Sequence, residues 1–102
     1  MGGGGVHGPG EGLSESVDVR AARITARGRL GLRGAELLAA TVGQLRRSGA
    51  RTVVLDLSVV TGAEPAALAV LARVRREVAA AGGRLVLSGG PAPEVPAPGR
   101  EG

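Results

Sequence analysis

The sequence contains no cysteine, no phenylalanine, tryptophan or tyrosine, and no lysine. Without cysteine, disulfide and zinc–thiolate frameworks are excluded. Without aromatic rings, the core must be built from leucine, valine, isoleucine and alanine, and no ring is present on which a nucleic-acid base could stack. Without lysine, a Walker phosphate loop is excluded. The single histidine, His7, lies in a glycine-rich segment where a solvated side chain is favoured over a ligand, so we expect no metal site.

All 13 basic residues are arginines, and they outnumber the 9 acidic residues to give a net charge of +4. A basic chain invites a nucleic-acid interpretation. The arginines are spread along the sequence rather than clustered, however, which favours solvated helix faces. We therefore expect no nucleic-acid partner.

The composition divides the chain into three parts. Residues 1–16 are rich in glycine and residues 89–102 alternate proline with small residues, so both are predicted to be disordered tails around a domain at 17–88. The first residues lack the charged and apolar regions of a signal peptide, and no apolar run approaches the ~20 residues of a membrane span. We expect a cytoplasmic protein without membrane insertion.

Between the tails, the period of the hydrophobic pattern alternates between that of strands and that of helices. The predicted elements are a hairpin turning near Arg20–Ala22, a helix, a strand, a helix and a strand, over residues 16–30, 32–49, 51–57, 65–83 and 84–88. The core-facing positions of the two helices are predicted to be Leu38, Val42 and Leu45, then Ala67, Leu71, Val74 and Val78.

The order β-β-α-β-α-β predicts an α/β fold. Two strands joined through a single helix are expected to be parallel, with a right-handed crossover. The expected architecture is a small mixed sheet of about four strands with the helices packed on one face.

The sequence offers few groups for catalysis. Asp56 and Glu64 flank one predicted loop and could form a hydrolytic dyad; the other carboxylates of the domain considered for such a pair are Asp18, Glu36 and Glu77. An Asp56 that accepts amide hydrogen bonds at the end of its strand is the favoured alternative. We therefore expect no catalytic residues, no cofactor, no small-molecule substrate and no enzymatic activity.

One long block carries a family resemblance. The stretch "GRL" at 28–30, a helix, and then "GARTVVLDLSVVTGAEPAALAVLARVRREVAAAGGRLVLSG" resemble the STAS domain, and more narrowly the bacterial anti-sigma factor antagonists. The resemblance covers Val17 to Ser88. It implies a partner switch, in which the protein binds an anti-sigma factor, often a serine kinase, and thereby influences sigma-factor-dependent transcription.

The resemblance also places the binding loop and helix start on Thr61, Gly62, Ala63, Glu64, Pro65, Ala66, Ala67 and Leu68. In the family this loop reads Asp-Ser-Ser-Gly, and its second serine is phosphorylated to break the complex. Here those four positions are Glu64, Pro65, Ala66 and Ala67, so the phosphosite is degenerate at Ala66. The acidic residue usual after "GRL" is replaced by Gly31, and the family's closing helix is replaced by the proline-rich tail.

The residue types at this junction favour a helix start that is not a switch. Pro65 fits the first helical position, Glu64 fits the N-cap or the residue before it, and Ala66 has no hydroxyl to phosphorylate. Ser58 and Thr61, expected in the loop after the strand, are other candidate phosphoacceptors. A role in packing or capping the turn is favoured for both.

Two further interpretations remain open from the sequence. The chain could be an accessory STAS subunit of a lipid-transport or sensory complex with no link to a sigma factor. It could also be a decayed paralogue that has lost its function.

Overall fold

The computed structural model describes residues 6–7 and 12–90. The elements in chain order are β1 (Val6–His7), β2 (Leu13–Asp18), β3 (Arg23–Leu30), α1 (Leu32–Arg47), β4 (Thr52–Ala63), α2 (Pro65–Ala80) and β5 (Arg84–Ser88). Most residues of the two predicted tails, 1–16 and 89–102, lie outside the described residues.

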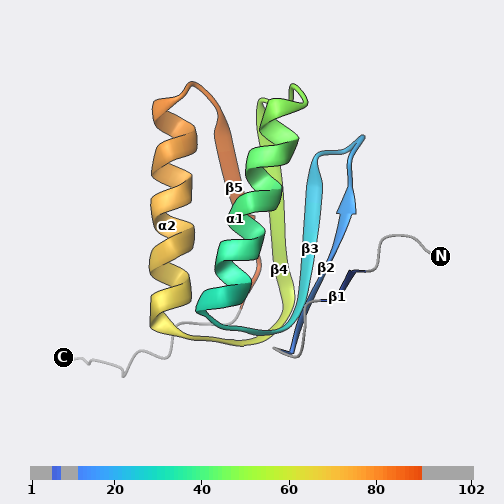
Figure 1. Cartoon of the computed structure of the whole chain (residues 1–102), viewed down its shortest axis with the longest axis vertical. Coiled ribbons are helices and arrows are strands. Elements are labelled where there is room, and N and C mark those ends of the chain that lie inside the picture. Colours follow the sequence, from blue (N-terminus) through green and yellow to red (C-terminus); the bar gives the residue numbers. More distant parts are fainter. Residues whose placement is uncertain (1–5, 8–11, 91–102) are drawn as a thin grey trace.

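The strands form one mixed sheet in the order β1-β2-β3-β4-β5. The pairs β1–β2 and β2–β3 are antiparallel, whereas β3–β4 and β4–β5 are parallel pairs, each joined through one helix. Both helices lie on the same side of the sheet (Figure 1). The predicted β-β-α-β-α-β order and the helices on one face are confirmed, and the two-residue strand β1 is added at the edge.

The core is wholly aliphatic. Among the described residues no polar or charged side chain is buried. The largest fully buried side chains are aliphatic and include Ile24, Leu30, Leu38, Leu55 and Leu71. The predicted inward positions of both helices are all buried, which confirms the helical period that the sequence indicated. The core therefore depends on the fit of branched side chains, because it contains no hydrogen-bonded network and no ring.

The strand β2 begins before the domain boundary that the sequence predicted. β2 starts at Leu13, four residues before the expected boundary at Val17, and the Leu13 side chain is buried. Leu13 pairs with Gly28 of β3. Its side chain packs against α1 at Gly34, where an added Cβ would lie 2.7 Å from Leu13 Cδ2. A single leucine within polar neighbours gave no period from which this strand start could be read.

β4 is longer than the sequence predicted, because it runs to Ala63 rather than ending at Leu57. From the pair Arg23↔Val54 to the pair Leu30↔Ala63, β4 advances nine residues while β3 advances seven, through two register shifts. Each shift inserts an extra residue in β4, as in a β-bulge. The buried positions consequently change from the odd residues Val53, Leu55 and Leu57 to Val60, which broke the alternation that reveals a strand.

Substitution of Gly28 tests the close approach of two backbones. Gly28 has φ +101°, and a Cβ there would collide with the carbonyl oxygen of Gly12, which accepts a hydrogen bond from the Arg29 amide (3.2 Å). We predict that Gly28→Ala lowers the free energy of unfolding by ~2 kcal/mol or more, since it adds a clash to a strained φ.

The matched control is Gly62→Ala, because Gly62 has no atom within 4 Å of its ideal Cβ and no positive φ. This variant should unfold at the same urea concentration as the parent or slightly above it. Equal urea midpoints for Gly28→Ala and Gly62→Ala would contradict the proposed close approach.

Candidate functional site

The junction predicted to bind a partner is a direct passage from strand to helix. Glu64 is the N-cap of α2, with φ −73° and ψ 146°, and Pro65 takes the first helical position. The Glu64 amide donates to the Leu30 carbonyl (3.0 Å), and the Glu64 carbonyl accepts from the Ala67 amide (2.9 Å). The expected placement of Glu64 and Pro65 is confirmed, and the start of α2 is tied to the end of β3.

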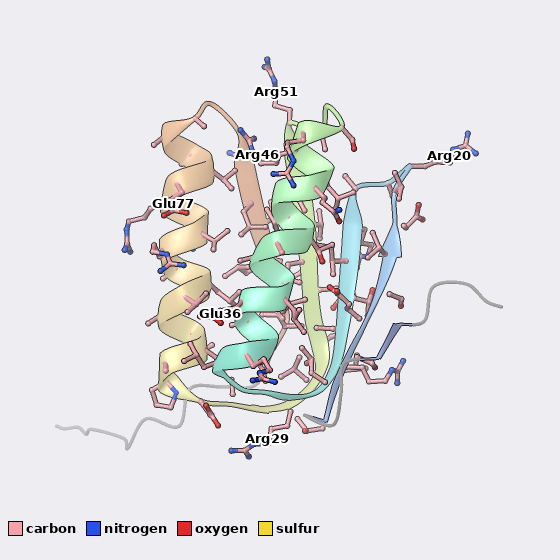
Figure 2. All side chains as sticks on the ribbon, viewed as in Figure 1. Arg20, Arg29, Glu36, Arg46, Arg51 and Glu77 are labelled. Atoms are coloured by element: carbon pink, nitrogen blue, oxygen red, sulfur yellow. The ribbon has the colours of Figure 1, made fainter. Side chains whose placement is uncertain are left out.

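The Glu64 side chain makes no capping hydrogen bond and turns instead toward the other helix. A Cβ built on Gly31, the N-cap of α1, would lie 3.5 Å from the Glu64 carboxylate. Glu64 Oε2 also lies 3.7 Å from an Arg29 guanidinium nitrogen, and solvent reaches both side chains. This ion pair contributes little to stability. The approach of Glu64 to Gly31 shows, however, that the two helix starts adjoin at one end of the molecule, where Figure 2 also shows Arg29.

The eight predicted site residues differ in what they offer to a partner. Thr61, Pro65, Ala66 and Leu68 are exposed, whereas Ala67 is fully buried and belongs to the core. The remaining three, Gly62, Ala63 and Glu64, are half-buried. Ala67 therefore supports the helix start from inside and offers no surface to a partner.

Leu32 was missed from the sequence. It is the first residue of α1 and is 44% exposed, while Leu68 in the first turn of α2 is 38% exposed. Leu32 lay outside the motif that the family resemblance defines. The feature of the sequence that could have revealed it is a leucine that does not share the inward face of α1 with Leu38, Val42 and Leu45. We define the helix-start surface as the exposed side chains of Leu32, Pro65, Ala66 and Leu68.

Ser58 and Thr61 lie within β4 rather than in a loop, which corrects the sequence-based expectation. Thr61 falls between the pairs Gly28↔Val60 and Arg29↔Gly62, so it is the extra residue of the second register shift. Both side chains are exposed. The bulges, and not a flexible loop, present these hydroxyls.

Asp56 accepts the hydrogen bonds that the sequence favoured. Asp56 Oδ1 accepts from the Ser58 amide (2.9 Å), and Oδ2 accepts from the Arg23 guanidinium (2.8 Å). The Ser58 hydroxyl and amide, followed by Arg23, lower the pKa of Asp56 to about 2. Such bonds favour the ionised form of a carboxylate.

The structure does not bring Asp56 and Glu64 together as a dyad. Asp56 pairs with Thr25 and Ser88 inside the sheet, whereas Glu64 follows the end of β4. A strand of this length separates the two by roughly 20 Å. Among the described residues, no three of histidine, cysteine, aspartate and glutamate gather as a metal site. In the same part of the chain, no helix has the length and apolar character for a membrane crossing.

Comparisons with known proteins agree with this architecture. The family model described as "Mlab, STAS domain" matches residues 13–97, and its first matched residue is the first residue of β2. Among solved structures, a chain titled "Crystal Structure Analysis of Mglu" is similar with a TM-score of 0.53 and 27% sequence identity. That similarity covers 72% of this chain but 18% of the other, so the present chain corresponds to a small part of it. No curated protein matches the chain.

The Asp56 cluster predicts an acid-dependent loss of stability. The pKa of Asp56 in the folded protein, about 2, lies below its ordinary value of 3.8. The ionised carboxylate therefore stabilises the fold above pH ~4, and this contribution is lost as the pH falls from ~4 toward ~2. Asp56→Asn should lower the urea midpoint at pH 6 and should differ little from the parent near pH 2.

The control for this comparison is Glu36→Gln, which removes an exposed carboxylate of α1. Its urea midpoint should follow that of the parent across the same pH range. A difference between Asp56→Asn and the parent that is the same at pH 6 and at pH 2 would contradict the assigned role of Asp56.

Proposed function

Since the chain belongs to the family described as "Mlab, STAS domain", we propose that it is a non-enzymatic regulatory module of the anti-sigma factor antagonist type. It binds a partner protein through the helix-start surface, and phosphorylation at position 66 does not switch that binding. The proposed partner is an anti-sigma factor or a related serine kinase. STAS domains are in general protein-interaction modules, which supports a protein partner.

The observation that carries the proposal is the exposed Ala66 beside the exposed Leu68 in the first turn of α2. The scaffold of a binding site is retained, since a rigid helix start presents apolar side chains to solvent. The hydroxyl is absent. A phosphate, which would add nearly two negative charges, therefore cannot form at this position.

The charges around the surface are consistent with protein docking. Arg29 and Arg33 flank the starts of the helices, and neither helix has an acidic residue in its first turn. The N-cap residue Glu64 lies close to Arg29 and partly offsets its charge, which leaves Arg33 as the unmatched charge of the two among the described residues. The exposed amide ends of both helices add partial positive charge. A partner with an apolar centre and acidic residues around it would complement this end of the molecule.

A second candidate function is an accessory STAS subunit of a lipid-transport or sensory complex. The matching family model carries the name Mlab and not that of an anti-sigma factor antagonist, which is the observation that favours testing it. The two candidates share the helix-start surface and differ in the partner. Affinity purification of the full chain from its native cells, followed by mass spectrometry, distinguishes an anti-sigma factor from a transport or sensory assembly.

A pair of leucine substitutions tests the surface. Leu68→Asp should weaken binding to the purified anti-sigma factor by at least roughly tenfold, because it places a charge at the apolar centre of the interface. Leu37→Asp alters an α1 leucine of similar exposure, 43%, outside the surface and should leave the affinity unchanged. Calorimetry with and without ATP should give the same affinity for the parent chain.

Two results would contradict the proposal. Equal affinities of the two aspartate variants would show that the helix-start surface is not the interface. ATP-dependent dissociation of the parent chain, with label incorporated at another residue, would show that the complex is switched in spite of Ala66.

Ala66→Asp separates binding from folding. A negative charge in the first turn of α2 should raise the free energy of unfolding by ~0.3–1 kcal/mol, because that turn contains no acid. The same charge should weaken partner binding, as phosphorylation does in the family that the chain resembles. Thermal denaturation and calorimetry measure the two effects, and an Ala66→Asp variant that is stabilised yet binds normally would contradict the proposed interface.

A further inference from the structure

The sheet has more strands than its two helices can cover. A helix is about 10 Å wide and neighbouring strands are about 4.8 Å apart, so two helices cover roughly four strands. Figure 1 shows α1 and α2 over one part of the sheet, with β2 and β1 to the side of α1. The helix-facing side of β2 therefore has no helix packed directly over it in the described part of the chain and lies next to α1. Val19, directly after β2, is 65% exposed, more than any other large apolar residue among those described.

An open groove of about 660 Å³ lies between β2 and the second half of α1. We refer to it as the β2–α1 groove. Its lining includes Glu15, Val17, Val19, Thr41, Leu45 and Arg47. Leu45 is buried and Val17 half-buried, so these two form an apolar floor that continues the core toward solvent.

One half-buried carboxylate lies in this groove without a matching charge. Both oxygens of Glu15 lie 3.1 Å from the Thr41 hydroxyl, which donates to them. Thr41 has a single hydroxyl hydrogen, and the Leu37 carbonyl competes for it at the same distance. No ion pair joins Glu15 to a cation among the described residues, and burial raises the pKa of its carboxyl group.

A carboxylate with two oxygens can accept about four hydrogen bonds, so Glu15 has unused acceptor capacity beside the apolar floor of Val17 and Leu45. Gln44 and Ser48 also line the groove, but neither carries a charge that matches Glu15. A basic side chain inserted from outside would supply both the missing donors and the missing charge. Arg47 lies on the rim of the same groove, so a uniformly cationic ligand would be repelled there. The charges instead suit an occupant with one basic residue facing Glu15 within an otherwise apolar face.

We propose that the β2–α1 groove docks an amphipathic helix of a partner protein, with apolar residues against Val17, Val19 and Leu45 and a lysine or arginine paired with Glu15. The helix would occupy the place of a third helix on this side of the sheet. An added strand fits less well, because β1 already pairs with β2 at Ser14 and Glu15. This inference does not rest on the proposed function, since Thr41 and Arg47 belong to the second half of α1, away from its start.

The test uses the full chain labelled with nitrogen-15 and two synthetic 18-residue amphipathic helical peptides with the same leucine stripe. One peptide carries lysine at the centre of the stripe, and the other carries norleucine, which has a similar shape without the charge. Titration with the lysine peptide should shift the amide signals of Val17, Val19 and residues 41–48. Glu15→Gln should raise the dissociation constant of the lysine peptide at least roughly tenfold and leave that of the norleucine peptide unchanged.

Glu36→Gln, an exposed carboxylate on α1 outside the groove, is the matched control and should bind both peptides as the parent does. Val19→Ser provides a second variant at an exposed position and should weaken both peptides. The proposal is overturned by shifts confined to other surfaces, by an absence of shifts, or by equal effects of Glu15→Gln on the two peptides. Dimerisation of the free chain through this groove would also overturn it.

Discussion

The parallel pairing of β3 with β4 determines where the rest of the protein lies. β3 leads into α1 and β4 leads into α2, and the two strands end opposite each other at Leu30 and Ala63. Parallel strands end at the same edge of a sheet, so both helices begin at one end of the molecule. The hydrogen bond from the Glu64 amide to the Leu30 carbonyl closes this end. The helix-start surface follows from this pairing.

The two bulges in β4 are part of the same constraint. β4 places Leu55 and Leu57 under the helices and ends with Ala63 opposite Leu30. With the same first pairs but without the two extra residues, Leu30 would pair with another residue than Ala63. The bulges also direct Ser58 and Thr61 to the surface. The pKa of Asp56 is lowered at the first bulge, where the Ser58 amide donates a hydrogen bond to the Asp56 carboxylate. The first bulge therefore accounts both for the local path of β4 and for the ionised state of Asp56.

The sequence predicted those parts of the fold that depend on periodicity. Leu38, Val42 and Leu45 recur at helical spacing, and Val53 and Leu55 alternate as strand residues do, so their elements were found. The start at Leu13 and the end of β4 were missed, because one isolated leucine and a bulged strand lack a clear period. At the candidate site, the N-cap and Pro65 followed from local chemistry. Leu32 and the Glu15–Thr41 contact could not be predicted, because each depends on which elements adjoin in space.

An aliphatic core of this size leaves part of the sheet without a cover. Two helices bury the centre of the sheet, while Val17 and Val19 remain at its margin beside an incompletely bonded carboxylate. The helix-start surface and the β2–α1 groove both include parts of α1, a helix of 16 residues that spans about 24 Å. Leu32 is its first residue and Thr41 its tenth, so about 14 Å of helix separates the two. Occupants of the two sites would contact one rigid element at different residues, and binding at either would stabilise the whole domain because each adds contacts that only the folded chain can make.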